Sequence, residues 1–279
     1  MTRFAKVEKQ AVRVCAISAL QFFMAAPASS LGAAVCEPWQ SSYAGNSATG
    51  QHVIALWQFN AGEETKDTSG RGHALTLQGA VIRQSGKFGP CLESFRGHPV
   101  EDKPHAAVAA NHPGLALKGA FTVEMWIQPK PELADYPEAF LLDKKYVAHS
   151  DYQLTLSAAD KAGQRRLNMR LGFGGDSEDY LSEPAKYEAG AWYHVAFTYD
   201  GAGAGRFYRD GAAFGGATRA GRASIAAGSH PLSIGDRVGS YYHGFPGFIS
   251  QVRLCHGVVA SGEVKMAPEL PPATKPGAP

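Results

Sequence analysis

Short stretches in which apolar and polar residues alternate dominate the middle of the chain. In Phe121–Gln128 the odd positions hold Phe, Val, Met and Ile, and the even positions hold Thr, Glu, Trp and Gln. Leu167–Phe173 and Trp192–Tyr199 alternate in the same way. A period of two is typical of strands with one buried face. No stretch keeps an apolar period of 3.6 for long enough to predict a major helix.

Turn residues separate these stretches, so a fold of many short strands is expected. Asp200-Gly201 and Asp210-Gly211 each follow an aromatic strand, and Asp-Gly is a strong hairpin signal. We predict an all-β fold, with two antiparallel sheets packed face to face as a jelly-roll sandwich. The clearest predicted strands are Val53–Phe59, His73–Leu77, Cys91–Phe95, Phe121–Gln128, Phe140–Lys145, Tyr152–Ser157, Leu167–Phe173, Trp192–Tyr199, Arg206–Arg209 and Phe248–His256.

The first 34 residues have the layout of a secretory signal peptide. Residues 1–13 are polar and basic, residues 14–26 are apolar but too short to span a bilayer comfortably, and small residues follow. We expect an exported protein, periplasmic or secreted, whose mature chain begins between Ser29 and Val35 and has no membrane span. Residues 35–52 are predicted to be a linker, residues 53–264 the sandwich, and residues 265–279 a Pro-rich disordered tail.

The charge balance argues against a nucleic-acid partner. The chain has 27 basic and 25 acidic residues, and its first 34 residues hold four basic residues and one acidic residue. The mature chain is therefore close to neutral, and no basic face for a phosphate backbone is expected.

Several motifs resemble those of laminin-G-like domains with the concanavalin-A-like lectin/glucanase jelly roll. They cover about Val53 to Glu263 in order and with sensible spacing. The resemblance implies this fold for one domain, and it implies binding to carbohydrate or to protein, because most members do one or the other. The motifs are Leu56-Trp57-Gln58-Phe59 with Asp67-Thr68-Ser69-Gly70, Gly86-Lys87-Phe88-Gly89, Phe121–Ile127, Trp192–Gly201 with Phe207–Gly211, and Phe245–Leu254.

The resemblance also bears on calcium and on the cysteines. Many members carry calcium near the rim, and Asp67 with Asn60 could supply oxygen ligands here. The alternative is an Asx-turn, in which Asp67 caps its own loop. In the resembled family the segments of Cys91 and Cys255 lie in the terminal part of the sandwich, so we predict a disulfide between them, with Cys36–Cys255 and Cys36–Cys91 as rivals.

No catalytic motif is found, and no catalytic residue is predicted. Glucanases on this scaffold carry alternating carboxylates on one strand. The acidic cluster from Asp176 to Asp179 lacks that spacing, follows Gly174-Gly175, and is expected to be a solvated loop.

Two places could bind a ligand. The first is a rim on the loop 236–243, where aromatic, guanidinium and carboxylate groups suit a hydroxylated ligand. The second is a polar sheet face, although Glu124 could simply pair there with Arg170 and covering loops could hide the tryptophans. The rim comprises Arg237, Tyr241, Tyr242 and His243, with Asp176 or Asp179, and the sheet face comprises Trp126, Glu124, Asn168, Arg170, Trp192 and His194.

The sequence therefore favours a non-catalytic recognition module for a glycan or an extracellular protein. The alternatives are a polysaccharide-cleaving enzyme without its usual motif, and a structural or assembly module of the cell envelope. No cofactor is certain, and calcium is possible.

Overall fold

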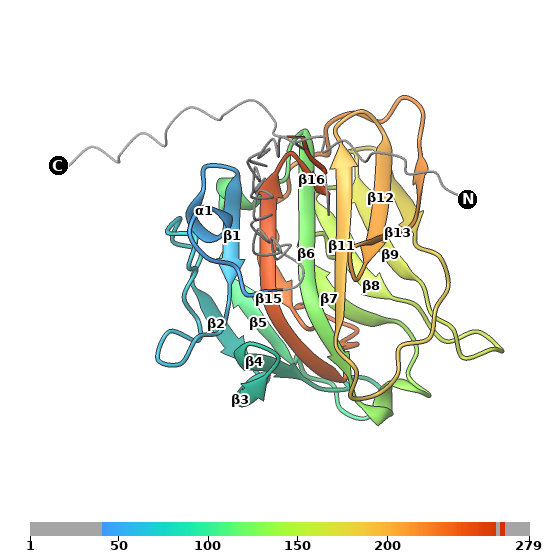
Figure 1. Cartoon of the computed structure of the whole chain (residues 1–279). Coiled ribbons are helices and arrows are strands. Elements are labelled where there is room, and N and C mark those ends of the chain that lie inside the picture. The colour runs from blue at the N-terminus through green and yellow to red at the C-terminus, as the bar shows by residue number, and fades with distance from the viewer. Residues whose placement is uncertain (1–40, 261–262, 266–279) are drawn as a thin grey trace, which may run out of the picture. The chain divides into compact units, whose positions relative to one another are not determined.

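The computed structural model describes residues 41–260 and 263–265, which form two facing antiparallel sheets with little helix. The predicted signal peptide and residues 266–279 of the predicted Pro-rich tail lie outside the described residues. Figure 1 shows β15, β6 and β11 in one layer, with β7, β8 and β9 in the layer behind them. The predicted all-β jelly-roll sandwich is confirmed.

Sheet A has eight strands and sheet B has seven within the described residues. Sheet A runs in the spatial order β13 (Ala212–Thr218), β12 (Ala204–Arg209), β11 (Tyr193–Asp200), β6 (Ala120–Pro129), β15 (Gly247–His256), β4 (Gly89–Ser94) and β3 (Val81–Gly86), with β1 (Val53–Trp57) paired to β15. Sheet B runs in the order β10 (Ser177–Leu181), β9 (Leu167–Gly172), β8 (Tyr152–Leu156), β7 (Ala139–Asp143), β14 (Leu232–Ile234), β5 (Ala106–Ala109) and β2 (Leu75–Gln78).

The remaining described elements are short. They are α1 (Asn46–Thr49), the 3₁₀ turns η1 (Pro113–Leu115) and η2 (Pro131–Leu133), and a two-stranded ribbon of β16 (Val258–Ala260) and β17 (Glu263–Lys265). Residues 41–52 belong to the predicted linker, yet Tyr43 and Ala48 are buried in a small apolar cluster with Val53, Leu56 and Cys255. This part of the predicted linker packs onto the sandwich.

The alternating strands supply the core between the sheets. Phe121, Val123, Met125 and Ile127 are fully buried there, as the alternation on β6 predicts. Leu167, Met169 and Leu171 on β9 face them from sheet B. Each side chain of this size stabilises the fold by about 1.5–3 kcal/mol when it leaves water. The Asp210-Gly211 hairpin is also confirmed, because both residues have positive φ, 50° and 83°, as a tight β12–β13 turn requires.

The predicted disulfide between Cys91 and Cys255 is wrong, because both residues are free, buried cysteines. The register explains why: β4 pairs with the start of β15 through Leu92 and Ile249, whereas Cys255 lies opposite Val53, farther along β15. One step along this register puts Cys91 beside Ser250, five positions from Cys255, so the two cysteines lie roughly 16 Å apart along the sheet. A disulfide needs Cα atoms within about 7 Å.

Candidate ligand-binding cleft

A cleft of about 570 Å³ opens on the outer face of sheet B. Strands β7 to β10 form its floor, and the loop that joins β7 to β8 and the loop after β14 form its rim. Its lining combines charged, amide and aromatic side chains, which is the composition of a site for a polar ligand. The lining residues are Glu138, Phe140, Lys145, Tyr146, Val147, His149, Gln153, Arg170, Asp176, Ser177, Asp179 and Arg237.

One row of polar side chains crosses four strands beneath the cleft. The strand register places Asp143 opposite Gln153, Gln153 opposite Arg170, and Arg170 opposite Asp179. Since directly paired residues share a face of the sheet, all four point to the same side. Gln153 Nε2 donates to Asp143 Oδ1 over 3.0 Å. The row is therefore a fixed arrangement of donors and acceptors.

Arg170 and Asp179 form the accessible end of this row. Arg170 Nε and Nη2 donate to the two Asp179 oxygens over 2.6 and 2.8 Å. About 40% of each side chain is exposed, so a ligand can reach the pair. Burial alone would raise the pKa of Asp179, but the hydrogen bonds and charge of Arg170 outweigh it and lower that pKa. Asp179 is thus held as a carboxylate.

Tyr146 and Arg237 define the opposite rim. Tyr146 has a φ of 50°, and its backbone N–H donates to Asp143 Oδ1 over 2.9 Å. His230 stacks on its ring at 4.9 Å, and the Arg237 guanidinium lies over the same ring at 4.8 Å. Both groups therefore pack against the Tyr146 ring. Arg237 Nε also lies 3.9 Å from Asp143 Oδ2. The rim is therefore rigid, and the polar groups rather than a free aromatic face are available to a ligand.

The acidic cluster is not a loop. Ser177, Glu178 and Asp179 belong to the edge strand β10, and Asp176 immediately precedes it. Arg222 Nη1 and Nη2 donate to the two Asp176 oxygens over 2.8 and 2.6 Å. These hydrogen bonds lower the pKa of Asp176. The expectation of a solvated loop is corrected: hydrogen bonds to β9 and ion pairs hold this segment at the edge of the cleft.

The cleft brings together some of the residues predicted for the rim. Arg237, Asp176 and Asp179 line it, whereas Tyr241, Tyr242 and His243 are not among its lining residues. Tyr241 is 71% exposed. Tyr242 Oη donates to Gly239 O, and the His243 ring packs against Tyr136 and Phe140.

The predicted polar sheet face combines residues of two different sheets. Trp126 and Glu124 are on β6 and His194 on β11, with Trp192 just before it, all in sheet A. Arg170 and Asn168 are on β9 of sheet B, so the predicted grouping, and the pairing of Glu124 with Arg170, are wrong. Alternation within a strand does not reveal which sheet the strand joins.

The sheet A part of that face is covered. Glu124 Oε1 accepts from Arg253, and Glu124 Oε2 accepts from Tyr43 Oη over 2.7 Å and lies 3.0 Å from His194 Nε2. Phe88 and Lys87, in the turn between β3 and β4, pack on Trp126. Trp126 is consequently buried, as the prediction of covering loops allowed, while Trp192 is half-buried.

Asp67 adopts the predicted Asx-turn. Its Oδ1 accepts from the backbone N–H groups of Ser69 and Leu56, and its Oδ2 accepts from that of His73. No group of three or more His, Cys, Asp or Glu that could hold a metal ion occurs among the described residues. Both oxygens of Asp67 therefore accept backbone hydrogen bonds, from its own loop and from β1.

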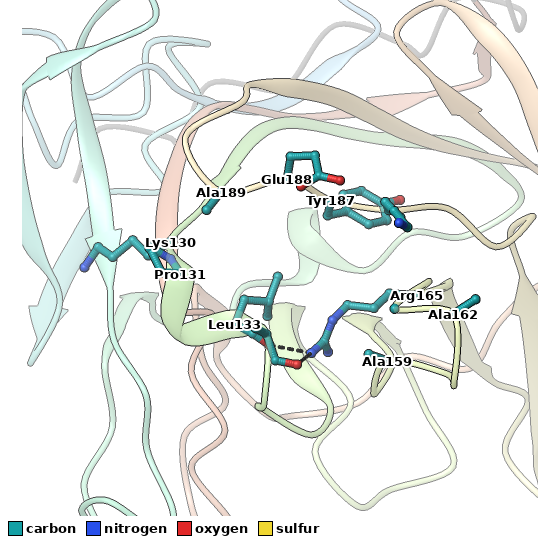
Figure 2. Close-up of a pocket in the computed structure, with 12 residues that line it drawn as sticks. Lys130, Pro131, Leu133, Ala159, Ala162, Arg165, Tyr187, Glu188 and Ala189 are labelled. Carbon is teal, nitrogen blue, oxygen red and sulfur yellow. Dashed lines mark hydrogen bonds between the residues drawn. The ribbon is translucent and has the colours of Figure 1, made fainter.

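A second cavity, of about 400 Å³, lies between the segments 130–134, 159–165 and 186–189. Figure 2 shows Tyr187 and Glu188 on one side and Leu133, Arg165 and Ala159 on the other. The Arg165 guanidinium donates to five backbone carbonyls, those of Leu133, Ala134, Tyr136, Pro137 and Ser157. Through these hydrogen bonds Arg165 holds the segment 133–137 and Ser157 together. The sheet B cleft remains the better candidate site because more polar side chains converge on it.

Several cleft residues were missed from the sequence. Lys145 ends a predicted strand, Tyr146 follows it, and Gln153 lies inside the next predicted strand, so none of them carried a motif. Gln153 had one available signal, since it lies on the polar side of an alternating strand. The position of Tyr146 depends on a loop conformation that the sequence pattern does not encode.

Within the described residues, no helix is long and apolar enough to cross a membrane. No curated protein matches the chain in sequence. Among solved structures, the binding domain of Paraclostridial Mosquitocidal Protein 1 is similar with a TM-score of 0.58 at 15% identity, covering 77% of this chain and 51% of that one. This chain thus spans about half the length of that relative.

Two further structures share the fold. Domain 4 of AbnA, an extracellular arabinanase from Geobacillus stearothermophilus solved with arabinotriose, has a TM-score of 0.54 at 19% identity and covers 74% of this chain and 93% of that one. The ligand-binding domain of botulinum neurotoxin serotype D, solved with N-acetylneuraminic acid, has a TM-score of 0.56 at 12% identity and covers 76% and 49%. A laminin-G family model matches residues 102–265, more than half of the chain. The chain therefore belongs to the concanavalin A-like lectin/glucanases superfamily.

Proposed function

We propose that this protein is a non-catalytic carbohydrate-recognition module whose ligand lies in the sheet B cleft. The observation that carries the proposal is the half-exposed Arg170–Asp179 pair at the end of a fixed polar row. Sugar hydroxyls both donate and accept hydrogen bonds, and this pair offers remaining N–H groups and carboxylate lone pairs side by side. The arabinotriose and N-acetylneuraminic acid complexes of the two structural relatives support a glycan ligand.

The electrostatics of the cleft favour recognition over catalysis. Glycoside hydrolysis needs a carboxylic acid whose pKa is raised so that it can donate a proton. Here the pKa values of Asp176 and Asp179 are both lowered by their arginine partners. Two carboxylates locked as anions suit hydrogen-bond acceptance, so we do not propose a glycosidase.

Screening the purified protein on a glycan array tests the proposal. Arg170→Ala should weaken binding to any glycan found there by about tenfold or more, because a hydrogen bond to a charged group contributes about 1.5–3 kcal/mol. Arg83→Ala is the matched control, since Arg83 also forms a cross-strand ion pair, with Glu93, but on sheet A. Equal binding by Arg170→Ala and wild type, or equal loss in both variants, would place the ligand elsewhere.

We also propose that the protein is exported. The charged, apolar and small-residue segments of the first 34 residues support this proposal. Intact-mass measurement of the product isolated from its native compartment should show an N-terminus between Ser29 and Val35. A product that retains residues 1–28 would contradict it.

A further inference from the structure

The cleft carries as many acidic as basic side chains. Among its lining residues the basic ones are Lys145, Arg170 and Arg237, and the acidic ones are Glu138, Asp176 and Asp179. Asp143, fully buried beneath them, adds one more carboxylate. A site that binds an anion normally presents surplus, unpaired positive charge, and this cleft presents no surplus.

Two of the three cations of the cleft, Arg170 and Lys145, already donate hydrogen bonds. Arg170 Nε and Nη2 already donate to the two oxygens of Asp179. The Arg237 guanidinium lies over Phe140 and Tyr146, and its Nε, 3.9 Å from Asp143 Oδ2, has no hydrogen-bond partner. Lys145 is buried and its Nζ donates to Ala148 O. The Arg237 side chain is only 11% exposed, whereas that of Arg170 is 41% exposed, so a ligand carboxylate would meet Arg170 first. It would have to displace Asp179 from Arg170 to gain a bidentate partner, and it would meet the charge of Glu138.

A neutral hydroxyl meets no such obstacle. It can accept from an unused N–H of Arg170 and donate to an unused lone pair of Asp179 without breaking the ion pair. We infer that the cleft selects neutral, uncharged sugars and rejects sugars that carry a carboxylate, with Asp179 as the residue that sets this preference. This inference rests on the proposed carbohydrate-binding function and adds the chemical class of the ligand.

The experiment compares glycans that share a chain and differ only in charge. Polygalacturonate and its fully methyl-esterified form make one such pair, and sialylated and desialylated glycans make another. Wild-type protein should bind neutral members only, and its affinity should be almost unchanged between about 0.05 and 0.5 M salt, because no counter-charge is involved in binding.

Asp179→Asn provides the decisive variant. It keeps the side-chain size and removes the charge that occupies the Arg170 fork, so binding to neutral glycans should fall while binding to acidic glycans rises by about tenfold. Asp102→Asn removes the same charge from an exposed loop outside the cleft and is the matched control. Circular dichroism of both variants checks that the fold is retained.

The outcomes separate the two claims. If wild type prefers acidic glycans, the preference for neutral sugars is overturned while carbohydrate binding stands. If Asp179→Asn gains no acidic binding, the assignment of that preference to Asp179 is overturned. If no glycan of either kind binds to wild type, the proposed function itself fails, and this inference fails with it.

Discussion

Glu124 should control how the stability of the sandwich depends on pH. Its carboxylate is buried on β6 and is shared by Arg253, His194 and Tyr43. Burial alone would raise the pKa of Glu124, but the charge of Arg253 and the hydrogen bonds from His194 and Tyr43 prevail and lower it from 4.5 to about 2. Because the folded pKa is depressed, its contribution is present above about pH 4.5 and is lost as pH falls toward 2.

The size of the effect follows from the shift. A difference of about 2.5 pKa units corresponds to about 3 kcal/mol of the free energy of unfolding. Glu124→Gln should therefore destabilise the protein by about 3–5 kcal/mol at pH 7, where it leaves the buried Arg253 unpaired. The difference in free energy of unfolding between wild type and variant should shrink by about 3 kcal/mol between pH 7 and pH 2, because protonation removes the Glu124 charge from wild type as well.

Urea unfolding measures this difference in free energy when it is followed by tryptophan fluorescence and repeated across this pH range. Glu63→Gln is the control, because Glu63 forms an exposed ion pair with Lys66 that contributes at most about 1 kcal/mol. If the difference in free energy of unfolding between wild type and Glu124→Gln stays constant from pH 7 to pH 2, the reasoning is refuted. Protonation of Glu124 would then not affect the stability of the fold.

Three further predictions concern single features. Lys144→Met should lower the free energy of unfolding in chemical denaturation by about 3–5 kcal/mol, because it removes the Nζ that lies 2.9 Å from Oδ2 of the fully buried Asp151. Cys91 and Cys255 should resist a thiol reagent in the native protein and react after denaturation, because burial raises their pKa values to about 11 and about 12. Tyr241→Ala should change thermal stability and array binding by less than about 0.5 kcal/mol, since Tyr241 is mostly exposed and outside the cleft.

The longer strands could be predicted from the sequence, whether they alternate, like β6, or are buried throughout, like β1. β6 differs from its predicted range by one residue at each end, because its apolar side faces the core along the whole strand. β5 and β14 were missed because Ala106–Ala109 and Leu232–Ile234 are only four and three residues long, too short to carry a clear pattern. β10 was missed because its acidic residues face arginines rather than water.

The candidate site was only partly predictable, for a physical reason. The residue types suited to a hydroxylated ligand were evident, and Arg237, Asp176 and Asp179 do line one cleft. Arg170 was assigned to a different surface, because the neighbour of a strand in a sheet is set by contacts distant in sequence. Gln153 joins Arg170 only through the β8–β9 register, which the local pattern of neither strand contains.

The two outer faces show why alternation alone cannot locate a binding site. Both sheets present polar side chains and arginine–carboxylate pairs on the side away from the core. On sheet A, Tyr43 reaches over the face and donates to Glu124, so the pair with Arg253 is buried and stabilises the fold. On sheet B no described segment seals the Arg170–Asp179 pair, which stays half-exposed. The same chemistry thus becomes structural where a segment of the chain covers it and available to a ligand where none does.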